Sequence, residues 1–272
     1  MSSWVKKLAQ SRKKMVQALA DFQMLEDGDR VLVAVSGGKD STVMALLFSE
    51  IQKKALINFS FSAVILDQKQ IGFRVDEYKT WLEGQNIPLK VIEEDTYSIV
   101  KEKVPVGKTS CGLCSRLRRG ILYNYAFNNG FNKIALGHHR DDFNETLLLN
   151  LLYTGKIASM PPKLMADDKR NIVIRPLMYV KEEDISAISD GLGIPLIPCN
   201  LCGSQSNLKR KKIKTLLSSL EEEHPGIASS IFKAQENIKP SQLSDSKLWN
   251  FEQINSDVTL KKKPEERITE GP

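Results

Sequence analysis

The sequence predicts an α/β protein built on a mostly parallel, twisted sheet with helices on both faces. Short apolar runs rich in β-branched residues recur along the chain, and helical patterns separate several of them. Runs without polar alternation are typical of parallel strands that are buried on both faces. The 272 residues are enough for one large domain with appendages.

The first part of the chain predicts a helix, a strand and a second helix. Apolar positions at helical spacing among lysines and arginines predict a basic amphipathic helix over residues 3–22. After the turn at 26–29, the apolar run at 31–35 predicts a strand. Glycine and polar side chains interrupt this run at 36–41, and residues 42–48 then predict a helix packed on the sheet.

Later segments continue the alternation. Further strands are predicted at 61–66, 89–92, 133–136 and 172–174, and helices at 115–128, 141–152, 209–220 and 225–237. The last residues are polar, which is typical of a poorly ordered tail. The predicted organisation is therefore a basic N-terminal helix at 1–28, a sheet domain with the cysteines at 29–204, a helical appendage at 205–240 and a tail at 241–272.

Three polar segments begin where predicted strands stop: 36–41, 67–69 and 137–142. Because the carboxyl ends of parallel strands meet at the same edge of a sheet, we expect these segments to gather there. Ligands of such sheets bind at this edge. The convergence is the first indication of a functional site.

The first of these segments reads Ser-Gly-Gly-Lys-Asp-Ser. Glycines let backbone N–H groups approach phosphate oxygens, and the N-terminus of a helix favours negative charge. We therefore predict a phosphate site formed by Ser36, Gly37, Gly38, Lys39, Asp40 and Ser41. A carboxylate at Asp40 beside phosphate implies a bridging Mg²⁺. The alternative is an ordinary strand-to-helix turn, and the spacing is not that of a Walker A loop.

The four cysteines form two Cys-x-x-Cys pairs, Cys111 with Cys114 and Cys199 with Cys202. In a reducing compartment this spacing favours a metal site, an iron–sulfur cluster or a sulfur-carrying redox step over disulfides. The pairs lie too far apart in the chain for a compact zinc ribbon. Four unrelated buried thiols are the alternative.

Two of the three histidines, His138 and His139, follow a predicted strand and precede Asp141 and Asp142. A histidine is a plausible general base because its pKa lies near neutrality. Alternatively, the acids cap the next helix and the histidines are ordinary loop residues. We expect catalytic residues among Lys39, Asp40, His138, His139, Asp141 and Asp142.

The net charge of +6 and the isoelectric point of about 9.0 fit a polyanionic partner such as nucleic acid. The basic run at 209–214 is either a solvated helix face or a contact for RNA. No apolar run of about 18 residues exists and the N-terminus is polar, so we expect no membrane span, no secretory signal and a cytoplasmic location.

Six motifs between residues 36 and 205 resemble the tRNA 2-thiocytidine synthetases, a family of PP-loop ATP pyrophosphatases that are also called tRNA-cytidine(32) 2-sulfurtransferases. The motifs lie at 36–41, 66–70, 111–120, 137–142, 160–164 and 198–205. The resemblance covers nearly the whole chain except the final tail. It implies the α/β sheet predicted above.

The resemblance also implies an activity. ATP would adenylate the C2 carbonyl oxygen of cytidine 32 in the tRNA anticodon loop, with Mg²⁺, and sulfur would then replace that oxygen at a 4Fe–4S cluster. The family's cluster ligands map onto Cys111, Cys114 and Cys202, which leaves Cys199 as a thiol outside the cluster. Three protein ligands leave one iron open for sulfur. A sulfur donor such as a cysteine desulfurase is implied, and such enzymes are often homodimers.

Three alternatives remain at this point. A tRNA-lysidine synthetase also has a PP-loop and an acid/His segment, but its chemistry needs no cysteine tetrad. The zinc-bearing enzymes that form 2-thiouridine need more cysteines and histidines than the four cysteines here provide. A non-catalytic iron–sulfur RNA-binding module is the alternative from a different functional class.

Overall fold

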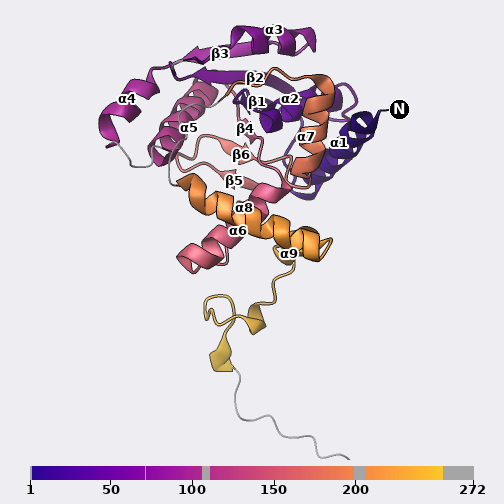
Figure 1. The fold of residues 1–272 in the computed structure, drawn as a ribbon, viewed down its shortest axis with the longest axis vertical. Helices are drawn as coiled ribbons and strands as arrows, with labels where there is room; N and C mark the ends of the chain where they lie inside the picture. The colour runs from indigo at the N-terminus through magenta and orange to yellow at the C-terminus, as the bar shows by residue number, and fades with distance from the viewer. Residues whose placement is uncertain (1, 71, 106–110, 199–205, 254–272) are drawn as a thin grey trace, which may run out of the picture. The chain divides into compact units, whose positions relative to one another are not determined.

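The computed structural model describes residues 2–70, 72–105, 111–198 and 206–253, with only the backbone of 111 and 206–208 (Figure 1). Contacts within the chain divide it into two compact units, Met1–Phe232 and Lys233–Pro272. Within its described residues, the second unit contains two short 3₁₀ helices, Pro240–Gln242 and Phe251–Gln253. None of the helices in the described ranges is long and apolar enough to cross a membrane.

The described part of the first unit is built on a six-stranded sheet in the order β3-β2-β1-β4-β6-β5. Its strands are β1 (Arg30–Val35), β2 (Ser60–Asp67), β3 (Leu89–Glu93), β4 (Lys133–Leu136), β5 (Lys163–Met165) and β6 (Ile172–Ile174). All neighbours are parallel except β5, which pairs antiparallel with β6. The predicted mostly parallel sheet is confirmed, and the one strand that the sequence did not predict is β5.

The order of the strands reverses at β1, because the chain runs outward through β2 and β3 and then returns to place β4 on the other side of β1. Ligands of doubly wound sheets bind at such a switch point, beyond the carboxyl ends of the central strands. The fold therefore directs attention to the segments that follow β1 and β4.

Helices cover both faces of this sheet, as predicted (Figure 1). In β1, Val31 and Val33 pack in the core shared with α1 (Ser3–Asp21), α2 (Lys39–Gln52) and α7 (Glu182–Leu192). Leu32 points to the opposite face and packs with Leu122 and Ala126 of α5 (Cys111–Asn128). This alternation is expected for a strand that is buried on both sides.

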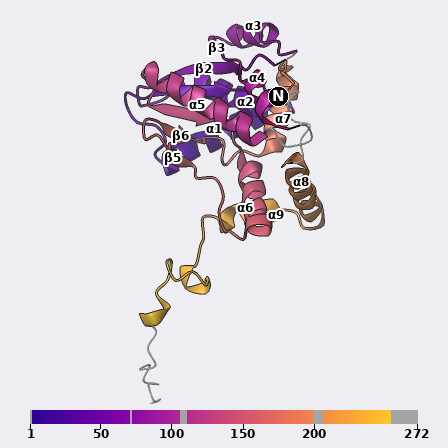
Figure 2. The same ribbon diagram turned by 90° about the vertical axis from the view of Figure 1, so that its left-hand side faces the viewer.

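The remaining helices lie around these layers: α3 (Asp76–Gly84), α4 (Thr96–Lys103), α6 (Arg140–Thr154), α8 (Ser206–Glu223) and α9 (Ile227–Ala234). Helix α8 runs beside α6 (Figure 2). Asn144 of α6 donates a hydrogen bond of 2.8 Å to the Ala228 carbonyl, which holds α9 against the same helix. The boundary predicted at residue 205 falls outside the described residues.

Candidate functional site

The structure brings the predicted polar segments together at the carboxyl edge of the sheet. β1, β2 and β4 are neighbours, so the segments that follow them leave the sheet side by side. We call residues 36–41, the predicted phosphate site, the phosphate loop. Gly137, directly after β4, approaches this loop so closely that a Cβ there would lie 2.9 Å from the Ser41 backbone nitrogen. Only glycine fits this contact without a shift of one loop.

The phosphate loop itself links β1 to α2. Gly37 has a φ of +79°, a conformation that side chains other than glycine rarely adopt. A Cβ at Gly37 would also lie 2.7 Å from Ile197, whose N–H donates a hydrogen bond of 3.0 Å to the Gly37 carbonyl. The Ser36 N–H donates to the Ser41 hydroxyl at 3.0 Å. The loop is therefore a compact turn at the N-terminus of α2, where an anion is favoured.

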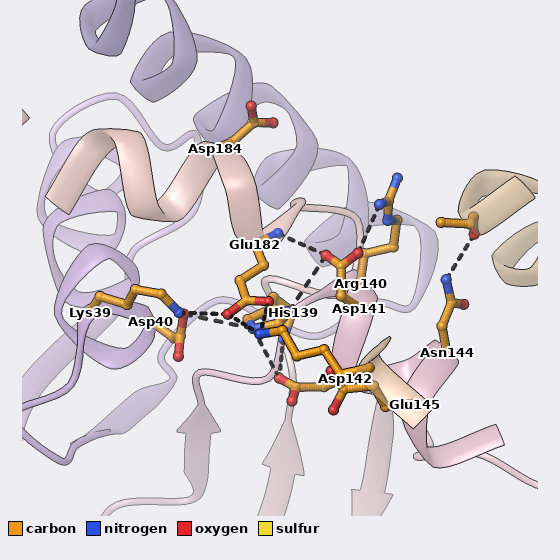
Figure 3. A network of polar contacts seen from close by, with 12 residues as sticks. Lys39, Asp40, His139, Arg140, Asp141, Asp142, Asn144, Glu145, Glu182 and Asp184 are labelled. Carbon is orange, nitrogen blue, oxygen red and sulfur yellow. Dashed lines mark hydrogen bonds and ion pairs between the residues drawn. The ribbon is translucent and has the colours of Figure 1, made fainter. Parts of the chain in front are cut away.

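Lys39 lies at the first position of α2 and is half-buried. Its ammonium pairs with Asp40 at 2.9 Å and with Glu182 at 3.1 Å (Figure 3). Burial alone would lower the pKa of Lys39, but the two carboxylates outweigh it and raise the pKa. Lys39 therefore carries a full positive charge at the phosphate loop.

Glu182, which the sequence did not single out, joins the phosphate loop to α8. Its carboxylate accepts hydrogen bonds of 2.8 and 2.6 Å from Lys214 of α8, in addition to the bond from Lys39. Burial would raise the pKa of Glu182, but the pairs with Lys214 and Lys39 lower it to about 2. The only local signal was an acidic first turn of α7, which is typical of many helices.

His139 lies between carboxylates and is only 4% exposed. Its Nε2 is 3.5 Å from Asp142 and 3.7 Å from Asp40, and its Nδ1 is 3.7 Å from Asp141 (Figure 3). Asp142 also accepts the His139 N–H at 3.0 Å, which caps α6. Asp141 accepts the Glu182 N–H at 2.7 Å and thereby holds the start of α7. Asp141 and Asp142 thus fix the starts of two helices and also form part of the site.

Helix α8 also contributes Arg210 to this network of carboxylates. Its guanidinium donates to Asp142 at 2.8 Å and to Glu145 at 2.6 Å. Burial would lower the pKa of Arg210, but Glu145 and Asp142 raise it, and burial raises the pKa of Glu145. The basic run predicted at 209–214 therefore contacts acidic groups of the site through Arg210 and Lys214.

His138 lines a cavity of about 650 Å³, which is also lined by Tyr123 and Arg175. His139 lines a different cavity, and Asp40 and Asp142 line both. Burial lowers the pKa of His138 to about 4, so the imidazole is neutral at physiological pH. The two adjacent histidines thus line two cavities that share these carboxylates.

One cysteine side chain lies within the described residues. Cys114 of α5 donates a hydrogen bond of 3.2 Å from Sγ to the Gln68 side chain. Gln68 lines a cavity of about 270 Å³ together with Ser36, Gly38 and Pro198. Pro198 directly precedes Cys199, so the described flanks of both cysteine pairs lie beside the phosphate loop.

Of the other two predicted ligands, the side chain of Cys111 and all of Cys202 lie outside the described residues, as does the predicted non-ligand Cys199. Within the described part of the chain, no group of three or more His, Cys, Asp or Glu side chains has the arrangement of a metal site. The chemistry of the surroundings still fits a thiolate site. Cys111 begins α5, whose N-terminus favours negative charge, and Arg118 follows one turn after Cys114.

Comparisons with known proteins show a family model and relatives that match most of the chain. A PP-loop domain family matches residues 7–213. A tRNA-cytidine(32) 2-sulfurtransferase of Bdellovibrio bacteriovorus is 56% identical over 245 residues, which cover 90% of this chain and 94% of the relative. One of Methylococcus capsulatus is 53% identical and covers 90% of this chain and 85% of the relative.

Among solved structures, the U34-tRNA thiolase NcsA from Methanococcus maripaludis, with its [4Fe-4S] cluster, has a similar fold. Its TM-score is 0.67 at 24% sequence identity, and the match covers 86% of this chain and 80% of that protein. This likeness independently supports the α/β fold.

Proposed function

The chain belongs to the family of tRNA-cytidine(32) 2-sulfurtransferases, transferase enzymes with a PP-loop, and on this basis we propose that it converts cytidine 32 of tRNA to 2-thiocytidine with ATP. The observation that supports this most directly is the contact between Cys114 and Gln68. Gln68 lines the same cavity as Ser36 and Gly38 of the phosphate loop. A thiol-bearing helix and an ATP-binding loop thus share one cavity.

The first proposed step activates the base. A carbonyl oxygen is a poor leaving group, so the C2 oxygen of the cytidine attacks the α-phosphorus of ATP and pyrophosphate leaves. The N–H groups of the loop at 36–41 hold the phosphates, and Lys39 neutralises the charge that develops on their oxygens. Gly37 and Gly38 let the backbone approach these oxygens without a side chain in the way.

We place Mg²⁺ at Asp40. Mg²⁺ keeps several waters and takes only one or two carboxylates together with substrate phosphates, so a preformed cage of protein ligands is not required. Asp40 lies at the second position of α2, beside the phosphate loop, and fits this role. When bound, Mg²⁺ would neutralise phosphate charge.

The second proposed step is substitution at C2. A sulfide equivalent forms the C–S bond, the bond from C2 to the adenylated oxygen breaks, and AMP leaves. We propose that Cys111, Cys114 and Cys202 hold a 4Fe–4S cluster, as found in the related fold of NcsA. When bound, the cluster supplies an open iron position for sulfur. The sulfur comes from a separate donor such as a cysteine desulfurase. Its persulfide sulfur becomes sulfide when an external thiol reductant displaces it and is itself oxidised to a disulfide.

The segment at 137–142, which contains the two histidines and two aspartates, serves both steps by fixing the helices that surround the site. Asp142 fixes the turn that begins α6 through the His139 N–H, and Asp141 fixes the start of α7 through the Glu182 N–H. His139 lies within reach of Asp40 and is therefore placed to accept or release a proton beside the phosphate loop. We also propose that the enzyme is cytoplasmic and forms a homodimer.

The test is a reconstitution under anaerobic conditions. The purified full chain is loaded with iron and sulfide and incubated with unmodified tRNA, ATP, Mg²⁺, a cysteine desulfurase with cysteine as the sulfur donor, and a thiol reductant. The tRNA nucleosides are then measured by mass spectrometry. We expect a brown chromophore, release of pyrophosphate and 2-thiocytidine at position 32. Binding of tRNA without pyrophosphate release would favour a non-catalytic module instead, and lysidine or 2-thiouridine would identify a different reaction.

Matched cysteine variants test the ligand set. Cys202→Ser is expected to prevent cluster loading and thiolation, whereas Cys199→Ser retains the chromophore. Loss of the chromophore in Cys199→Ser together with its retention in Cys202→Ser would show that the ligands are assigned wrongly.

A further inference from the structure

The cavity that contains His138 lies against the β4 side of the phosphate loop. At about 650 Å³ it is large enough for a nucleoside. Ser36 of the phosphate loop and Arg118 of α5 line both this cavity and the smaller one that Gln68 lines, so the two cavities adjoin each other at this loop. Two organic bases must meet at this loop in the proposed reaction, the adenine of ATP and the base that is modified.

His138 and Arg175 both line the larger cavity, and each has a buried polar atom without a hydrogen-bond partner among the described residues: His138 Nδ1 and Arg175 Nε. Arg175 is anchored because its Nη1 donates to the Pro161 carbonyl at 2.5 Å, a bond that does not involve Nε. A buried polar group without a partner costs roughly 1 to 3 kcal/mol. Two such groups in one cavity point to a polar ligand that satisfies both.

The protonation states of these two groups define what that ligand presents. Burial lowers the pKa of His138 to about 4, so one ring nitrogen is an acceptor at neutral pH. Burial also lowers the pKa of Arg175, but a guanidinium stays protonated in proteins and only donates. The wall therefore offers one acceptor and one donor.

The rest of the cavity suits a flat ring from RNA. Tyr123 of α5 is half-buried and lines the cavity, and Met160 lines it as well. Bases taken out of an RNA loop stack on such side chains. Arg118 and Arg119 also line this cavity and supply charge for a phosphate backbone.

We propose that this cavity binds the cytosine that is extruded from the RNA loop, and that His138 distinguishes cytosine from uracil. Cytosine presents an amino donor at N4 and acceptors at N3 and O2, which match an acceptor at His138 Nδ1 and a donor at Arg175 Nε. In the tautomer with Nδ1 as acceptor, His138 cannot form a hydrogen bond with the acceptor that uracil presents at position 4. The assignment rests on the proposed function for the identity of the RNA base.

The test uses the reconstituted full chain and an anticodon stem–loop RNA with a fluorescent cytidine analogue at the target position. Binding of the wild type is expected to raise the fluorescence, because the base leaves the stack. His138→Leu keeps a similar volume but removes the acceptor, and Arg175→Lys removes Nε. We expect each variant to weaken the fluorescence change and to lower kcat/KM for the cytidine RNA roughly 10- to 100-fold, with KM for ATP unchanged within about twofold.

The matched control is His224→Leu, since His224 is an exposed histidine near the end of α8 and lines neither cavity. It is expected to leave all three readouts unchanged. ATP affinity also reports folding, so a variant that binds ATP normally is a valid test. The opposite pattern, a raised KM for ATP with normal RNA fluorescence, would assign the cavity to adenine and overturn the proposal.

The outcomes separate this inference from the proposed function. If the wild type forms no 2-thiocytidine but the fluorescence change still depends on His138, the base pocket is supported and the reaction is wrong. If the wild type forms 2-thiocytidine and His138→Leu discriminates uridine from cytidine RNA as well as the wild type does, the pocket assignment is wrong.

Discussion

Replacement of Glu182 by glutamine tests the network that joins the phosphate loop to α8. The variant keeps the size of the side chain but removes the charge that Lys39 and Lys214 share at 3.1 and 2.6 Å. Lys214 then loses its pair with Glu182, and Lys39 keeps only its pair with Asp40. We expect Glu182→Gln to destabilise the fold and to loosen α8.

The pKa of Glu182 gives the size of the effect. It falls from 4.5 to about 2, and each unit corresponds to about 1.4 kcal/mol. The carboxylate is less than one third exposed, so we expect a loss of about 2 to 3 kcal/mol of unfolding free energy at pH 7. Because the pKa is lower in the folded state, this stabilisation is complete above pH 4.5 and is lost as the pH falls toward 2.

The assay is equilibrium unfolding in urea, with Glu183→Gln as the matched control. Glu183 is the next residue of α7, and its pair with Lys181 at 3.0 Å is exposed on both sides. Such pairs contribute about 0 to 1 kcal/mol. A larger loss in Glu182→Gln at pH 7, with a difference that shrinks below pH 4.5, supports the reasoning. Equal losses in both variants would refute it.

Three further predictions concern the backbone conformation of a glycine, a buried ion pair and the pH dependence of stability. Gly37→Ala is expected to raise KM for ATP at least tenfold. Gly28 has a similar φ of +83° but open space around it, so Gly28→Ala should change only the stability, by about 1 to 2 kcal/mol. Equal KM values for ATP in the two variants would contradict this. Asp29→Asn breaks a pair with Lys133 at 2.6 Å in which both side chains are almost fully buried, so urea unfolding should show a loss of about 3 to 5 kcal/mol, and a loss below about 1 would be incompatible with that burial. His138 has a folded-state pKa of about 4 against 6.5, so unfolding takes up a proton in this range and wild-type stability falls as the pH drops from 6.5 to 4. The unfolding free energy of His138→Leu, measured in urea at several pH values, should lack this loss between pH 6.5 and 4. The same dependence on pH in the variant as in the wild type would refute the prediction.

The strands could be predicted where burial dictates the residue type. β4 and β6 have the predicted bounds, because both are apolar runs in the interior of a parallel sheet. β5 was not predicted, since it spans only Lys163–Met165 and pairs at the edge of the sheet. Edge pairing uses main-chain hydrogen bonds, which leave little trace in the sequence.

The site divides along the same line. Residues with a local signature were predictable: Gly37 adopts a positive φ, and Asp142 caps a helix. Glu182 and Arg175 were not, because each reaches the site only through the packing of its helix or strand. Residues that act through tertiary contacts become visible only when the fold is known.

The placement of these contacts links ATP binding to the second cysteine pair. Ile197 is hydrogen-bonded to Gly37 of the phosphate loop, two residues before Cys199. On the other side, Arg210 of α8 is held by Asp142, which also caps α6 at the site. Both described ends of the segment that carries Cys199 and Cys202 are therefore fixed to the elements that surround the phosphate loop. We therefore predict that substitutions at either anchor, Ile197 or Arg210, change cluster loading and ATP affinity together.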